Sequence, residues 1–405
     1  MRTPSAPSPL GVVTACAAFV LIGALQALYG PAVSAFRADF GIGLGTAGLA
    51  LGAHFVGGVA GVLVHAGLSR RFPARALLAT ALVIMAIGGA GVALAPRWPL
   101  ALLAALVAGI GFGGIDYGLN DLFARAYTRR GPAMLNILNA HFGIGAVAGP
   151  FLVAALGPQR YPAIFLGFAV ASLLLVPGLR GIRPGDGRTP TGTTAPGAMA
   201  RSFALLAAFI TVYVLNVGIE AGVGGWEPTH LETIGHSAAS AASATSVYWL
   251  MLTVGRFLVV PLTLRWSDQT IVVGSCVGAA VCLALSAVPS IAAVAYAGVG
   301  LFIAPVFPTA LPWLRRAVPG AQGAGAYVIA ASMIGGVVVP PLVGGGIAWT
   351  GVAALPVLLS ALNGLCLVTL WWIIRAQRTE RHRRSGHDPI DSSSDAGDPM
   401  VKRHG

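Results

Sequence analysis

Long apolar runs dominate the chain, and short polar stretches separate them. Most runs are about 20 residues long, which is the length that a helix needs to cross a hydrocarbon core of about 30 Å. The pattern predicts twelve membrane-spanning helices, near residues 11–34, 45–68, 74–95, 99–123, 132–157, 161–179, 203–226, 238–264, 270–288, 291–314, 321–349 and 353–375. An all-α membrane protein is therefore the expected fold class.

The composition excludes a soluble protein. Of the 405 residues, 56% are apolar and 9% are charged, and the mean hydropathy is +0.81, whereas about a quarter of the residues are charged in soluble domains. The four cysteines lie inside apolar runs without the spacing of metal ligands: Cys16, Cys276, Cys282 and Cys366. We therefore expect them to be small packing residues, and the sequence predicts neither a metal nor a cofactor.

The distribution of basic residues indicates the orientation in the membrane. The formal net charge is +12, but Lys and Arg are scattered over short loops and the C-terminal tail, so a nucleic-acid partner is not expected. If the N-terminus is cytoplasmic, 22 of the 25 basic residues lie on or next to that side, and only Arg37, Arg97 and Arg160 lie outside. Because basic residues are retained in the cytoplasm, we predict a multi-pass protein of the cytoplasmic (plasma) membrane with both termini inside.

A polar segment rich in Gly, Pro, Thr and Arg divides the spans into six and six. The expected organisation is an N-terminal bundle (1–179), a flexible cytoplasmic linker (180–202), a C-terminal bundle (203–375) and a disordered basic cytoplasmic tail (376–405). GVLVHAGLSRR (61–71) aligns with RFLVVPLTLRW (256–266), and two further segment pairs share a similar offset of about 190 residues. Such repetition predicts two pseudo-symmetric six-helix bundles with a site between them near the midplane.

The fourth span carries the polar group with the strongest indication of function. Asp116 and Asn120 are four residues apart and share a helical face with Gly109 and Gly113. A charged side chain at the bilayer centre costs about 2.5–3.5 kcal/mol on insertion scales, so an acid there indicates a functional site. Burial disfavours the charged form of a carboxyl group, which makes Asp116 a candidate for proton binding. The alternative is a structural carboxylate that bonds to a neighbouring helix.

The seventh span carries a polar and aromatic stripe on an apolar helix, made of Tyr213, Asn216, Glu220 and Trp226. Lipid does not accept such a stripe, so it is predicted to face the protein interior. Glu220 is a second candidate for proton coupling, and the other three residues are candidates for binding a solute. Trp226 is equally well explained as an interfacial belt residue. Glu227 and Glu232 are expected outside the membrane, in the loop that follows.

Further polar residues in other spans are candidates for lining a solute site: Asn136, Asn139, His141, Gln26 and His54. The first three cluster near the cytoplasmic end of the fifth span. For His141, a hydrogen-bonded packing role is the more common alternative to proton transfer.

The motifs of the common membrane enzymes and primary pumps are missing from the sequence. There is no HExxH, no GxSxG and no Walker sequence, and each of these motifs carries a defined catalytic mechanism. An enzyme or an ATP-driven pump is therefore not predicted. Gradient-driven or facilitated movement of a small solute is the remaining class.

Several segments resemble the major facilitator superfamily. Two segments resemble conformational elements of that superfamily. One is the turn from Gly61 to Arg75, which contains Arg70 and Arg71, and the other is Gly255-Arg256 in the eighth span. GFGGIDYGLND (111–121) and YVLNVGIEAGVGGW (213–226) resemble the fucose permease-like branch. The resemblance covers residues 10–375 and implies twelve spans in two bundles that transport a solute by alternating access.

The same resemblance implies roles for three residues. Asp116 matches the fourth-span acid of sugar–proton symporters, Asn120 matches its accompanying asparagine, and Glu220 matches a seventh-span acid of many members. The first span, ALQALYGPAVSAF at 24–36, lacks the further acid of the sugar symporters. The basic turn also lacks the usual aspartate, around His65.

Three functions follow from these observations. The first is a proton-coupled secondary transporter, with a sugar-like solute as substrate, that works as a monomer in the lipid bilayer. The second is a proton-coupled exporter of drug-like compounds or metabolites, which the missing first-span acid favours. The third, from another class, is a non-transporting receptor or lipid-handling protein, which has no need of intramembrane acids.

Overall fold

A computed structural model describes residues 7–69, 71–127, 131–182, 199–318 and 324–385. Every regular element in these ranges is a helix. The first group comprises α1 (Pro9–Phe40), α2 (Leu44–Ala47), α3 (Leu49–Leu68), α4 (Ala74–Leu94), α5 (Trp98–Ala126), α6 (Gly131–Leu156), η1 (Pro158–Arg160), α7 (Tyr161–Leu175) and η2 (Val176–Gly181).

The second group follows in the same order along the chain. It comprises α8 (Met199–Thr233), α9 (Ala238–Leu262), α10 (Asp268–Leu285), η3 (Pro289–Ile291), α11 (Ala292–Ile303), α12 (Val306–Ala317), α13 (Ala324–Thr350), η5 (Val352–Ala354) and α14 (Leu355–Ser385). The tenth span is divided into α11 and α12 at Pro305, where proline supplies no backbone N–H.

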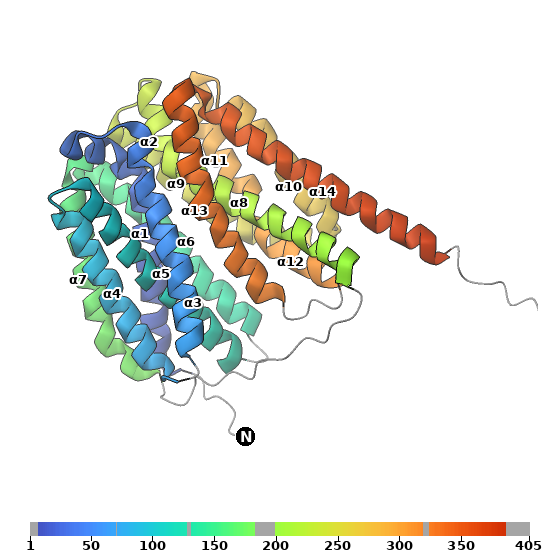
Figure 1. Cartoon of the computed structure of the whole chain (residues 1–405), viewed down its shortest axis with the longest axis horizontal. Helices are drawn as coiled ribbons and strands as arrows, with labels where there is room; N and C mark the ends of the chain where they lie inside the picture. The colour runs from blue at the N-terminus through green and yellow to red at the C-terminus, as the bar shows by residue number, and fades with distance from the viewer. Residues whose placement is uncertain (1–6, 70, 128–130, 183–198, 319–323, 386–405) are drawn as a thin grey trace, which may run out of the picture.

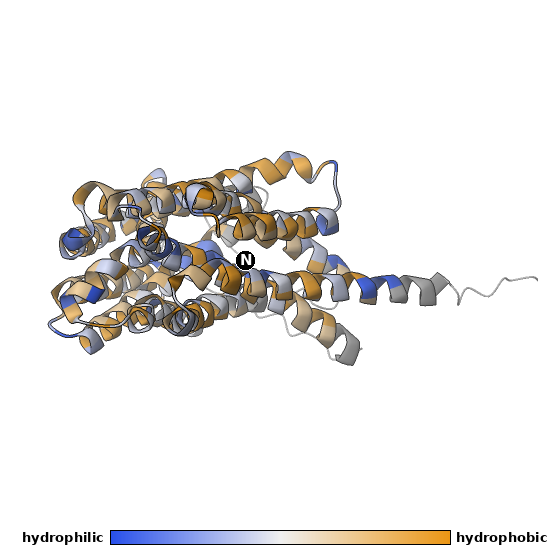
Figure 2. Cartoon of the chain, turned by 90° about the horizontal axis from the view of Figure 1, so that it is seen from above, coloured by the Kyte–Doolittle hydropathy of each residue, from blue (hydrophilic) through white to orange (hydrophobic). Residues whose placement is uncertain are grey.

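Twelve of these helical stretches are long and apolar enough to cross a membrane, so the predicted number of spans is confirmed. They form two six-helix bundles, one from α1 to α7 and one from α8 to α14 (Figure 1). Apolar residues predominate along the helices, while hydrophilic residues gather at the loops and toward the end of α14 (Figure 2). The predicted fold class, an all-α membrane protein with two pseudo-symmetric bundles, is confirmed.

Glycines at helix ends display the internal symmetry. Gly41 and Gly235 follow the first and seventh spans with φ of 62° and 105°, and Gly157 and Gly351 follow the fifth and eleventh spans with φ of 88° each. The left-handed region favours glycine because it has no Cβ. Both pairs are 194 residues apart, close to the offset that the sequence repeats predict. All four glycines lie at the end of the bundles that carries α2, here named the α2 face, and the opposite end is named the linker face.

Two helices are longer than predicted. α8 continues through Pro228 to Thr233, so the prediction that Glu227 lies in a loop is wrong. α14 continues to Ser385, ten residues into the segment predicted to be a disordered tail. The rest of that predicted tail, and residues 183–198 of the predicted linker, lie outside the described residues.

The two bundles meet through α3 and α13, α6 and α9, α1 and α8, and α2 and α13. Figure 1 shows α3, α13 and α8 side by side. The closest approaches lie toward the α2 face, where Gly30 faces the backbone of Gly224 and the ring of Trp226 lies against Gly48 and Gly344. Small residues allow helices to approach this closely in a membrane.

Packing between the bundles at the α2 face leaves almost no space. A cavity of about 10 Å³ remains between α1, α3, α8 and α13, beside Tyr29, Leu51 and Trp226. A volume of this size holds no more than about one water molecule. The α2 face is therefore closed in this arrangement.

Candidate functional site

Asp116 lies in a small amide network on the N-terminal bundle. Its carboxylate accepts a hydrogen bond from Asn120 Nδ2 at 3.0 Å, and the same amide bonds to the Asp116 carbonyl oxygen at 3.0 Å. Asn139 of α6 reaches toward Asn120, with its Nδ2 3.4 Å from the Asn120 side-chain oxygen, and also bonds to Leu135 O at 2.8 Å. The network therefore connects α5 to α6.

The partners of Asp116 are neutral. In the part of the chain that the structure describes, no cation forms an ion pair with it. An amide stabilises either form of a carboxyl group, whereas a guanidinium strongly favours the ionised form. Asp116 is thus placed where it can exchange a proton without breaking a salt bridge.

Glu220 has a different environment on the C-terminal bundle. Its carboxylate lies 3.8 Å from Arg256 NH2, and the side chains of Arg256 and Glu220 are 29% and 13% exposed. Tyr248 OH donates to the backbone oxygen of Glu220 at 3.0 Å. Sequence reasoning placed Arg256 near the cytoplasmic interface and missed the pair, although an arginine inside an apolar span already calls for an acidic partner.

The remaining residues of the seventh-span stripe are buried. Tyr213 donates from its hydroxyl to Phe307 O at 3.0 Å, which joins α8 to α12. Asn216 is 3% exposed, and its Nδ2 has no hydrogen-bond partner among the described residues. Trp226 is 1% exposed, and its indole N–H donates to Pro340 O of α13 at 2.8 Å. Its position between the bundles does not fit an interfacial belt residue.

Three further candidates lie apart from this stripe. His54 is fully buried inside the N-terminal bundle, where Tyr29 OH lies 3.3 Å from its Nδ1 and its ring contacts Phe112. His141 is half-buried, and its Nδ1 lies 2.7 Å from Ile137 O, one turn earlier on α6. Gln26 is half-buried on α1. The contacts of both histidines fit the packing alternative.

The candidates for conformational roles are spread over both bundles. A Cβ at Gly255 would meet the backbone of α11, and a Cβ at Gly61 would meet the backbone of α5, so both glycines allow close helix packing. Arg71 is exposed at the linker face. Arg70 and the side chain of Asn136 lie outside the described residues.

For Glu227 the predicted position, in a loop outside the membrane, differs most from the structure. It is 0% exposed, inside the C-terminal bundle, and neither of its carboxyl oxygens has a hydrogen-bond partner in the described ranges. Glu232, expected in the same loop, lies half-buried in the last turn of α8. No local pattern indicated this burial, because Glu-Pro after Trp226 is also typical of a helix end.

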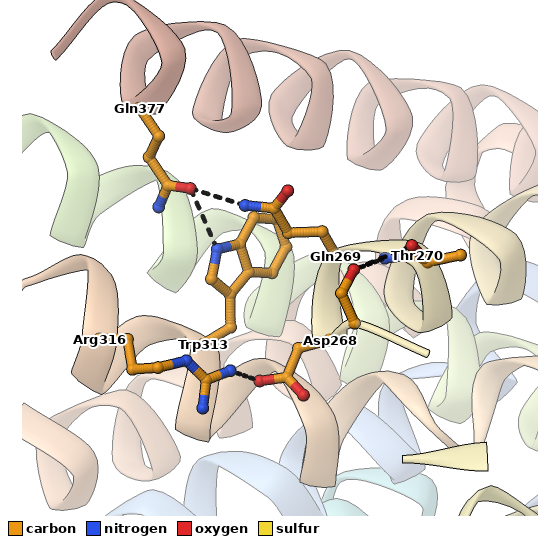
Figure 3. Close-up of polar contacts among 7 residues, drawn as sticks. Asp268, Gln269, Thr270, Trp313, Arg316 and Gln377 are labelled. Carbon is orange, nitrogen blue, oxygen red and sulfur yellow. Dashed lines mark hydrogen bonds and ion pairs between the residues drawn. The ribbon is translucent and has the colours of Figure 1, made fainter. Parts of the chain in front are cut away.

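A polar cluster holds three helix ends together at the linker face of the C-terminal bundle (Figure 3). Asp268, at the start of α10, forms an ion pair with Arg316 of α12. Gln377 of α14 accepts from Gln269 Nε2 at 2.9 Å and from Trp313 Nε1 at 3.2 Å. The cluster fixes α10, α12 and α14 relative to one another within this bundle.

Two helical bundles with acids, amides and an arginine inside apolar helices define a multi-pass membrane protein. The family follows from the sequence: a family model described as Major Facilitator Superfamily matches residues 15–297. Since this match covers more than half of the chain, the chain belongs to that superfamily. No curated protein matches the sequence.

Solved structures share the fold. A D-xylose-proton symporter is similar with a TM-score of 0.70 and 14% identity, over 89% of this chain and 96% of that chain. The nucleoside transporter NupG is similar with a TM-score of 0.70 and 14% identity, over 91% of this chain and 98% of that chain. The xylose transporter XylE from E. coli, in an inward open conformation, has a TM-score of 0.70 and 13% identity, over 89% and 94%. At these identities the likeness concerns the fold alone.

Proposed function

We propose that the protein is a proton-coupled secondary transporter that moves a small polar solute across the cytoplasmic membrane by alternating access. The two bundles rock about their contact, so that the solute site opens to one side at a time. The linker face is cytoplasmic in this proposal, so the closed α2 face is the outer one. The protein works as a monomer of the fucose permease-like branch.

The observation that carries the proposal is the environment of Asp116. An acid inside an apolar span is costly, and among the described residues the side-chain hydrogen bond to Asp116 comes from the neutral amide of Asn120. Glu220, in contrast, has Arg256 as a counter-ion. Asp116 therefore carries the coupling proton, while Glu220 binds solute or controls opening together with Tyr213, Asn216 and Trp226.

The substrate class is a hydroxylated polar solute. Asn120 and Asn139 offer amide donors and acceptors of the kind that bind hydroxyl groups. The similar structures include a D-xylose-proton symporter and a nucleoside transporter, and both of these solutes carry several hydroxyl groups. A thermal-shift screen of sugars, nucleosides and drug-like compounds selects the solute, because a ligand of the folded state raises apparent stability.

Transport of the selected solute into proteoliposomes then tests the role of Asp116. Asp116→Asn keeps the shape of the side chain and removes its titration. We expect the variant to lose uptake driven by a pH gradient and to keep exchange of labelled for unlabelled solute. The matched control is Asp39→Asn, which changes an exposed acid at the end of α1 and should leave both activities intact. Full gradient-driven uptake by Asp116→Asn would end its proposed role.

Export of a less hydroxylated compound is the second candidate. The reason is the first span, which has no acidic residue before Asp39. The direction of the gradient that drives movement distinguishes the two functions, since a symporter accumulates solute from the acidic side and a proton antiporter expels it toward that side.

The proposed orientation is tested by cysteine labelling in intact cells. Cysteines introduced at Thr193 and Ser393 should react only after the membrane is opened, whereas a cysteine at Pro158 should react from outside. Labelling of the Thr193 position from outside would reverse the topology.

A further inference from the structure

Glu227 is the most completely buried acid of the described chain, and the function proposed above does not use it. It lies in α8 between Trp226 and Pro228, it is 0% exposed, and the described residues supply no hydrogen bond to either carboxyl oxygen. An unpaired carboxylate in such a place is strongly unfavourable, and a buried acid commonly avoids this cost by binding a proton.

The polar side chains of α9 and α11 that interact electrostatically with Glu227 are hydroxyl groups, those of Thr245, Tyr248 and Tyr296. None of them forms a hydrogen bond with its carboxyl group. Thr245 donates instead to Ala241 O at 3.2 Å, and Tyr248 donates to the Glu220 backbone oxygen at 3.0 Å. A carboxylate at this place receives no hydrogen bond from the described residues, so the surroundings favour the neutral acid.

The other ionisable groups around Glu227 do not neutralise it. On α8, His230 is one turn further, and its Nδ1 lies 3.0 Å from Tyr296 OH. Arg256 of α9 pairs with Glu220, and the charge that interacts with Glu232 is that of Arg37 on α1.

The remaining packed helices add no charge near Glu227. α11 and α13 contain no acidic or basic residue, and the basic residues of α14 begin only at Arg375, at the linker face.

Glu227 is adjacent to the contact that closes the α2 face. The preceding residue, Trp226, bonds to Pro340 O and places its ring against Gly48 and Gly344 of the bundle interface. This turn of α8 therefore lies at the interface with the other bundle, while α8 packs on α9 and α11 of its own bundle. If the bundles separate at this face, Trp226 leaves Gly48, and water gains access to the turn that holds Glu227.

We propose that Glu227 is a second proton-binding site, occupied when the α2 face is closed and released to water when that face opens. The proton adds to the carboxylate to give the neutral acid, which avoids the cost of a buried, unpaired charge. The inference goes beyond the proposed function, because it holds whether or not Asp116 couples solute to protons.

Infrared difference spectroscopy of the purified protein tests the occupied site directly. At neutral pH the wild type should show a carboxylic-acid carbonyl band that Glu227→Gln removes and Asp116→Asn leaves in place. A spectrum in which Glu227→Gln removes no such band would overturn the proposal. If Glu227→Gln does not fold, Glu227→Asp serves instead, since a carboxyl group in a changed position must shift the band, and an unmoved band would contradict the site.

Cysteine accessibility tests the link between the proton and closure. The probe is Val33→Cys, which replaces a residue that is 5% exposed beside the cavity at the α2 face, in a background with the four native cysteines changed to alanine. One proton bound only in the closed state changes the ratio of open to closed molecules by up to about tenfold per pH unit. The labelling rate in detergent should therefore rise with pH.

Glu227→Gln should keep the labelling rate low at every pH, because the amide mimics the neutral acid. Asp39→Asn, which changes an exposed acid at the end of α1, should retain the pH dependence of the parent. Thr46→Cys, on an exposed neighbour, controls for the reactivity of the thiol itself. An equal pH dependence in wild type and Glu227→Gln would refute the link.

Discussion

Replacing Gly48 by alanine should shift the protein away from the arrangement with a closed α2 face. Gly48 has φ of −63° and ψ of −17°, which alanine adopts without strain, so the backbone is not the obstacle. A Cβ at this position would lie 2.8 Å from Trp226 Cη2 and closer still to Cζ2. The neighbouring atoms must therefore move, or the bundles must separate.

The size of the shift follows from the packing. Overpacking a closely packed site costs about 1–3 kcal/mol, and here the cost falls on the closed arrangement only, because Trp226 leaves Gly48 when the bundles part. A free-energy difference of 1–3 kcal/mol changes an equilibrium about 5- to 150-fold. Gly48→Ala should lower the ratio of closed to open molecules by a factor in that range.

The assay is the labelling rate of Val33→Cys, with two controls. Gly345→Ala lies on the adjacent helix α13 with open space around its added methyl group, so it should label as slowly as the parent. Trp226→Leu added to Gly48→Ala removes the ring that the methyl group meets and should restore closure in part. Labelling of Gly48→Ala at the parental rate would show that the Trp226 contact does not control the α2 face.

Three further variants test the division of roles within the bundles. Glu220→Gln should weaken apparent solute affinity more than it shifts the pH profile of transport, which uptake measured across pH values would check. In the double variant Asp116→Asn with Glu220→Gln, the free-energy losses in transport should equal the sum of the losses in the two single variants. A coupling energy above about 1 kcal/mol in this double-mutant cycle would indicate contact or a shared proton. Asp268→Asn should lower the thermal stability only slightly, by about 0–1 kcal/mol, because its partner Arg316 is 64% exposed; a large loss in a melting curve would contradict this.

The length of the apolar runs was sufficient to predict the spans, because the thickness of the bilayer sets the length of a membrane-spanning helix. The Asp116–Asn120 contact was also accessible, since residues four apart on a helix are neighbours. The Asn139 contact required the packing of α6 on α5, which the sequence does not encode in any local pattern. Asn139 was a candidate only because it is a polar residue inside an apolar span.

The errors around α8 have a common physical cause. Glu227 was assigned to a loop because a charge in hydrocarbon is costly and the following proline suggested a helix end. In the structure the residue lies inside the C-terminal bundle, where α8 packs on α9 and α11, and this packing exists only after folding. The Glu220–Arg256 pair escaped detection for a similar reason, since its partners lie on different helices.

Proton movement linked to solute transport tests the central claim most directly. Proteoliposomes containing a pH-sensitive dye would receive each sugar or nucleoside that the thermal-shift screen selects, without an imposed gradient. The account predicts that a transported solute acidifies the lumen with wild-type protein and enters by exchange, without proton movement, with Asp116→Asn. A solute that the wild type transports with no acidification, at a rate that ignores an imposed pH gradient, would contradict it.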